Sequence, residues 1–131
     1  MSGVRRLNSG SPWEGIVGYS RVVVRGDAAW VSGTTSMVDG AVAHPGDAAA
    51  QTRQALSILR EALERAGFTL ADVVRTRIFV TDISRWEEIG RVHGEVFGDV
   101  RPATTMVQVT ALIDPAMLVE IEADAVRGAG A

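Results

Sequence analysis

Residues 118–126 constrain the fold most, because their side chains alternate strictly between apolar and acidic. The apolar set is Val119, Ile121, Ala123 and Ala125, and the acidic set is Glu120, Glu122 and Asp124. Successive side chains of a β-strand point to opposite faces of its sheet. The segment therefore predicts a strand with one buried face and one charged face.

Residues 73–80 predict a second two-faced strand. The pattern places Arg75, Arg77 and Phe79 on one face, opposite Val74, Thr76, Ile78 and Val80. The sheet would then carry charges of both signs on the face away from its helices. Because charged side chains are seldom fully buried without partners, that face is either solvated or packed against another subunit.

Two amphipathic helices should cover the apolar face. The first begins at Asp47 and ends at Gly67, with Glu61 and Arg65 spaced as an i,i+4 pair. Its apolar stripe is Thr52, Ala55, Leu56, Leu59, Ala62, Leu63 and Ala66. In the second helix, Ser84 and Glu87 have capping-box spacing, and the helix should end at Gly98. Its expected inward face is Trp86, Ile89, His93, Val96 and Phe97.

The remaining strands are short. They are expected at residues 19–25 and 28–32, separated by the turn Gly26-Asp27, and at residues 104–109, with a possible edge strand at residues 4–8. The element order β-β-β-α-β-α-β-β predicts an α+β fold with one mixed sheet and both helices on one face. The whole chain, residues 1–131, is expected to form one domain, with residues 1–15 irregular or in an edge strand.

Composition narrows the classes of function. The net charge is −3, and the pI of about 5.3 argues against nucleic-acid binding, which favours a basic surface. Without cysteine, the chain can have no disulfide, thiol nucleophile or thiolate metal site. We expect no metal site and no cofactor, since His44 has no second ligand at metal spacing. We also find no signal peptide or membrane span, and expect a cytoplasmic protein.

Short motifs occur in order along residues 18–127. They are Gly18-Tyr19-Ser20, Val31-Ser32-Gly33, the helix segment 50–56, the strand segments 72–76 and 79–82, Arg101-Pro102-Ala103 and the strand segment 120–123. Any one of them is weak, but together they resemble the Rid (reactive intermediate deaminase, or YjgF) family over nearly the whole chain. The resemblance implies a chorismate-mutase-like fold. It also implies a homotrimer, whose sheets form a central barrel with three small-molecule clefts between subunits.

In the deaminase branch of that family, the cleft hydrolyses enamines and imines to 2-oxo acids and ammonia without metal or cofactor. A strand glutamate holds the water, an arginine after Pro-Ala grips the substrate carboxylate, and a tyrosine and a serine-glycine pair line the cleft. The resemblance carries these roles onto Glu120, Tyr19, Ser32 and Gly33. Thr104 stands at the arginine position.

Two further positions depart from the family pattern. Met106 stands where a cysteine is common, and Gly90 where many deaminases have an asparagine. Losing one side of a desolvated carboxylate–arginine pair costs about 2–5 kcal/mol, so the deaminase reaction itself is in question. Arg21 or Arg101 could replace the missing cation, and Arg21 is favoured because strand spacing puts it on the same face as Tyr19.

Each candidate also has a structural interpretation. Glu120 could simply pair with Arg75 or Arg77, and Tyr19, Ser32, Gly33, Thr104 and Met106 could serve packing or strand geometry alone. His93 lies on an apolar helix face, where most histidines are hydrogen-bonded core residues. Three functions remain open: a hydrolase of imines, enamines or related C–N compounds with altered specificity, a non-catalytic metabolite-binding or regulatory trimer, and an endoribonuclease. The acidic charge balance disfavours the last.

Overall fold

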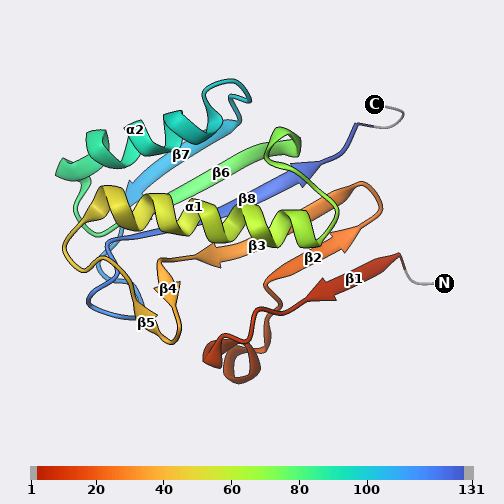
Figure 1. Cartoon of the computed structure of the whole chain (residues 1–131), viewed down its shortest axis with the longest axis horizontal. Coiled ribbons are helices and arrows are strands. Elements are labelled where there is room, and N and C mark those ends of the chain that lie inside the picture. Colours follow the sequence, from red (N-terminus) through yellow and green to blue (C-terminus); the bar gives the residue numbers. More distant parts are fainter. Residues whose placement is uncertain (1–2, 129–131) are drawn as a thin grey trace.

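A single mixed sheet forms the framework of the chain, and two helices lie across one of its faces (Figure 1). The computed structural model describes residues 3–128. The sheet order is β1-β2-β3-β8-β6-β7, with β6 and β7 parallel and the other neighbours antiparallel. The strands are β1 (Val4–Leu7), β2 (Val22–Arg25), β3 (Ala28–Thr34), β6 (Val73–Val80), β7 (Ala103–Gln108) and β8 (Val119–Val126). The predicted α+β class and edge strand are confirmed.

Smaller elements fill the connections. A hairpin of β4 (Met37–Val38) and β5 (Ala41–Val42) follows β3. The helices are α1 (Ala48–Arg65) and α2 (Trp86–Phe97), with short helical turns η1 (Glu14–Gly18), η2 (Leu70–Asp72) and η3 (Ile83–Arg85). No helix in residues 3–128 is both long enough and apolar enough to cross a membrane.

The central strand β8 has the two faces that its alternation predicts. Val119, Ile121, Ala123 and Ala125 are buried, whereas the acidic side chains between them lie on the open face of the sheet. The expectation for β6 is wrong at one position: Val73 is buried and Val74 is 48% exposed. A register shift between Val73 and Arg75 in the pairing with β8 causes this difference, because a bulge moves one residue out of the two-residue repeat.

Helix α1 begins where the sequence predicts. The Asp47 carboxylate accepts a hydrogen bond from the Ala50 amide at 3.0 Å, and Gly67 follows the helix with φ of +88°. The predicted Glu61–Arg65 pair is not found. Arg65 instead donates to the Asn8 carbonyl, and the i,i+4 pair of this turn joins Arg60 to Glu64 at 3.1 Å.

The predicted start of α2 needs correction. Asp82 accepts hydrogen bonds from both the amide and the hydroxyl of Ser84, so Asp82 rather than Ser84 is the capping residue of this segment. The turn η3 occupies residues 83–85, and α2 starts at Trp86, which is 56% exposed. The buried residues of α2 are Ile89, Val92 and Phe97, so Trp86 was wrongly assigned to the inward face and Val92 was missed.

The open face of the sheet carries paired charges beside apolar side chains. Arg77 on β6 lies 3.2 Å from Glu122 and 3.3 Å from Asp124 on β8. Trp30 on β3 and Val107 on β7 remain partly exposed. The mixed-charge face that the sequence predicts is therefore present.

Candidate functional site

A groove of about 870 Å³ brings most of the predicted site residues together. The loop that carries η1, the ends of β3 and β8, the β4–β5 hairpin and residues 113–117 contribute to it. Figure 1 shows the η1 loop and the β4–β5 hairpin extending beyond the same side of the sheet. Of the predicted residues, the groove is lined by Tyr19, Arg21, Ser32, Gly33 and Glu120.

Glu120 lies directly over Gly33. A Cβ atom placed on Gly33 would be 1.8 Å from Oε2 of Glu120 and 2.8 Å from its Cδ. The close approach occurs where the β3–β8 register shifts between Val31 and Thr34, which leaves Ser32 and Gly33 as a bulge. Bulges often re-aim side chains beside functional sites. Only a glycine leaves room for the carboxylate in this position.

The Glu120 carboxylate is half-buried and has no hydrogen-bond donor or ion-pair partner among residues 3–128. It faces Phe79 across the strand pair, while Arg77 pairs with Glu122 and Asp124. The alternative that Glu120 pairs with Arg75 or Arg77 is therefore wrong. Burial raises the pKa of Glu120 above its ordinary 4.5, Arg21 opposes this rise, and the neighbouring Glu122 adds to it.

Arg21 is a buried cation whose hydrogen bonds hold the end of β3. The residue as a whole is only 7% exposed. Its Nη1 donates to the carbonyl of Gly33 at 2.7 Å, to the hydroxyl of Thr34 at 3.0 Å and to the carbonyl of Ser32 at 3.2 Å. Arg21 therefore supports the bulge from which Glu120 approaches Gly33.

Glu14 balances the charge of Arg21 and was not identified from the sequence. Its Oε2 lies 3.9 Å from Nε of Arg21, and both side chains are 8% exposed. Ser9 donates to the same carboxylate from its amide and its hydroxyl. Burial by itself would raise the pKa of Glu14, but the hydrogen bonds from Ser9 lower it below 4.5 overall. No periodic pattern marks this loop, so the sequence offered no signal for the buried pair.

Tyr19 contacts Arg21, but not because strand alternation places both side chains on one face, as the sequence predicted. Strand β2 begins only at Val22, so strand alternation does not govern residues 19–21. The Tyr19 hydroxyl nevertheless lies 3.4 Å from Nη2 of Arg21 and 3.5 Å from Oγ of Ser11. The Arg21 guanidinium lies 5.6 Å from the centre of the tyrosine ring. Ser32 is less available, because its hydroxyl donates to the Ser20 carbonyl at 2.6 Å.

Thr104 and Met106 do not line this groove. On β7 they pair with Thr76 and Ile78, which are buried on the helix face of the sheet. Thr104 and Met106 thus share the face opposite to that of Glu120. Arg101 is also outside the groove, and its Nε donates to the Gly98 carbonyl at 3.1 Å. A single chain therefore does not bring the arginine-equivalent position to Glu120.

A short hydrogen-bond chain connects Thr104 to α2. The hydroxyls of Thr104 and Thr76 are 2.8 Å apart, and the Thr76 hydroxyl is 2.9 Å from Nε2 of His93. Burial lowers the pKa of His93 below 6.5, and its ring packs 4.7 Å from that of Phe97. These contacts make His93 a hydrogen-bonded residue of the helix–sheet interface.

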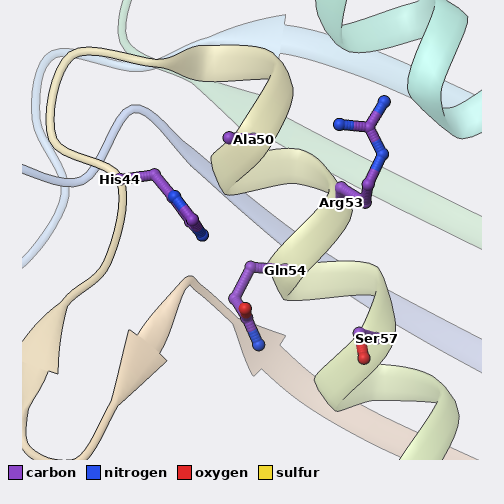
Figure 2. A pocket seen from close by; sticks show the side chains of 5 residues that line it. All are labelled: His44, Ala50, Arg53, Gln54 and Ser57. Carbon is purple, nitrogen blue, oxygen red and sulfur yellow. The ribbon is translucent and has the colours of Figure 1, made fainter.

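A second, smaller hollow of about 290 Å³ lies beside α1. Figure 2 shows the His44 ring pointing toward α1, whereas the Arg53 side chain points away from His44. Arg53 pairs instead with Glu95 on α2 at 3.2 Å. Within residues 3–128, no three His, Cys, Asp or Glu side chains are grouped so that they could hold a metal ion.

Comparisons with known proteins agree on one family. The model of the family described as Endoribonuclease L-PSP matches residues 11–127. The crystal structure of Rv2704 from Mycobacterium tuberculosis, a member of the YjgF/YER057c/UK114 family, is 56% identical with a TM-score of 0.86, over 95% of this chain and 99% of that one. An uncharacterised protein of Streptomyces coelicolor is 40% identical over 96% of this chain and 94% of its own. The 3-aminoacrylate deaminase RutC of Acinetobacter baylyi is 44% identical over 61% of this chain and 63% of its own.

Proposed function

Because this chain belongs to the YjgF/Rid family, which the Endoribonuclease L-PSP model describes, we propose that it is a cytoplasmic hydrolase of small imines, enamines or related C–N compounds. The observation that carries the proposal is the half-buried Glu120 carboxylate. It lines the groove and has no partner among the described residues. A carboxylate in this state is free to bind water or substrate. The deaminase activity of the relative RutC supports the same class of chemistry.

The groove contains a carboxylate and a hydroxyl group that could support imine hydrolysis. Water adds to the electrophilic carbon of the protonated imine, forming a C–O bond, while Glu120 accepts a proton from that water. Glu120 then gives this proton to the nitrogen and the C–N bond breaks. The added hydroxyl loses its proton as the C=O bond forms, so ammonia and a carbonyl compound leave. A base acts best when its pKa is near the working pH, and burial moves the pKa of Glu120 in that direction. The Tyr19 hydroxyl also lines the groove and could orient the nitrogen.

We further propose that the protein works as a homotrimer with its ligand sites between subunits. Within one chain, Thr104 and Met106 lie on the face opposite to that of Glu120, so they could join a groove only from a second copy. The exposed Trp30 and Val107 on the open face favour such packing. Light scattering coupled to size exclusion should give about three times 13.9 kDa. A monomer at micromolar concentration would contradict the trimer.

A non-catalytic, metabolite-binding or regulatory trimer is the second candidate. It is favoured by Thr104, which occupies the position of the arginine that grips carboxylates in the resembling deaminases. An endoribonuclease is disfavoured, despite the family's description, because the net charge is −3 and RNA binding relies on basic, aromatic-lined surfaces.

Ammonia release from freshly generated imines tests the hydrolase directly. We expect Glu120→Gln to abolish it, because an amide cannot accept the proton from water. Asp124→Asn is the matched control, since Asp124 lies on the same face of β8 but outside the groove. If both variants lose ammonia release equally, or if Glu120→Gln keeps full activity, the proposed catalytic role of Glu120 is contradicted. No ammonia from any imine would favour the binding protein.

A further inference from the structure

The one positive charge of the groove is already engaged by the protein. Among the described residues that line the groove, Arg21 is the only lysine, arginine or histidine. Its Nη1 donates to three oxygens of residues 32–34, and its Nε faces the Glu14 carboxylate. An incoming anion could reach the guanidinium without displacing these partners only at Nη2, which already contacts the Tyr19 hydroxyl at 3.4 Å. Arg21 is therefore better suited to holding the groove together than to binding a carboxylate.

The remaining charges that line the groove are negative. They belong to Asp39, Glu120 and Glu122. Arg77 balances Glu122 at 3.2 Å, but no ion pair joins Asp39 or Glu120 to any residue in the part of the chain described. Like charges that meet in a partly desolvated site repel strongly. A ligand carboxylate would thus meet two acidic side chains that have no ion-pair partner among the described residues, and no free cation there.

Apart from its hydroxyl side chains and glycines, the rest of the lining is apolar. The apolar residues are Pro12, Trp13, Val17, Met37, Ile58, Ile113 and Met117. Val17 and Ile113 are 67% and 61% exposed in the single chain, so a ligand with an apolar group would cover surface that now faces water. Ligand sites with mostly apolar walls and a few polar groups typically orient such molecules by their polar end.

From these observations we infer that the groove selects uncharged or cationic ligands with an apolar substituent, and that it disfavours carboxylates. This inference rests on the proposed function, for which it names the substrate class: a carboxylate-free imine, bound as the neutral species or as the protonated iminium. The apolar substituent would lie against Trp13 and Ile113, and the C=N group would face Glu120. Protonation of the nitrogen makes the imine carbon more electrophilic and also makes the ligand complementary to Glu120 and Asp39.

Binding of three probes of similar size and different charge tests the inference without any catalysis. The probes are benzylamine, benzyl alcohol and benzoate, which are cationic, neutral and anionic near neutral pH. Binding to the full-length protein is followed by NMR chemical-shift changes at low ionic strength. We expect benzylamine to bind at least about tenfold more tightly than benzoate, a ratio that added salt reduces by screening. In the double variant Asp39→Asn/Glu120→Gln the ratio should fall toward unity.

Two results would overturn the inference. One is benzoate binding as tightly as benzylamine, because a cation from another source, such as Arg101 of a second copy, would then complete the site. The other is the absence of any shift at groove residues with all three probes.

Catalysis is measured separately, by comparing ammonia release from benzaldimine, generated by an amine oxidase, with that from 2-iminopropionate. If the probes bind in the expected order but neither imine releases ammonia, the inferred ligand class is supported and the proposed hydrolase activity is disproved. If ammonia is released from 2-iminopropionate alone, the hydrolase activity is supported and the inferred ligand class is disproved.

Discussion

The Glu120 carboxylate occupies the space that a side chain on Gly33 would need, with Oε2 only 1.8 Å from the position of an added Cβ. Gly33 lies in the bulge of β3, and Arg21 holds its carbonyl at 2.7 Å. The glycine, the bulge and the buried arginine thus act together to place one unpaired carboxylate in the groove.

Gly33→Ala should displace Glu120 without unfolding the protein. The atoms nearest to the added methyl group are Oε2, Cδ and Cγ of Glu120, and a flexible side chain can rotate away. We expect at least about a tenfold loss of ammonia release, since small displacements of a catalytic group are costly. The melting temperature should change little. Gly94→Ala is the control: a Cβ there meets nothing within 4 Å, so activity should persist and helix stability should rise by about 0.5–1 kcal/mol. Full activity in Gly33→Ala would show that the position of Glu120 is unimportant.

Arg21→Met should destabilise the fold strongly. The substitution leaves the Glu14 carboxylate buried without its cation and frees the oxygens of Ser32, Gly33 and Thr34. Breaking one side of a buried ion pair costs about 3–5 kcal/mol, which urea denaturation can measure. Arg53→Met removes the exposed pair with Glu95 and should cost less than about 1 kcal/mol. Similar costs for the two variants would mean that Arg21 does not support the groove.

Glu120→Gln should stabilise the protein at neutral pH, although we expect it to abolish the proposed activity. The folded protein raises the pKa of Glu120 above 4.5, so it favours the protonated form. The contribution of this group to stability is therefore complete below pH 4.5 and is lost as the pH rises through the folded-state pKa. Urea denaturation of both proteins between about pH 4 and 8 should show an advantage of the glutamine variant that grows over this window. A constant difference at all pH values would contradict a raised pKa.

Thr104→Arg should restore preference for carboxylates if the proposed trimer brings β7 to the groove of a second copy. The variant should release ammonia from 2-iminopropionate faster than the wild type, and benzoate should bind more tightly than in the wild type. The cost is the hydrogen bond to Thr76, about 0.5–1.5 kcal/mol. Thr105→Arg, whose side chain lies on the opposite face of β7, is the control and should give no such gain. An unchanged preference in a correctly assembled Thr104→Arg protein would show that β7 does not reach a ligand site.

Local patterns of apolar and polar residues were sufficient to predict most of the secondary structure. The alternation of residues 118–126 and the stripe of α1 depend only on neighbours along the chain, because strand and helix periods are properties of the backbone. The same reasoning failed where a longer-range contact intervened. The bulge between Val73 and Arg75 arises from pairing with β8, and Asp82 rather than Ser84 is the residue that caps the turn before α2.

The sequence by itself determined which residue types were available for chemistry, namely Glu120, Tyr19 and Gly33, together with a threonine at the position where the family resemblance implies an arginine. Only the tertiary structure decided how they are used. Strand register puts Thr104 on the face opposite to Glu120, and the fold of the loop before β2 commits Arg21 to Glu14. Register and loop packing depend on contacts between residues far apart in the chain, and no local pattern of side chains encodes them.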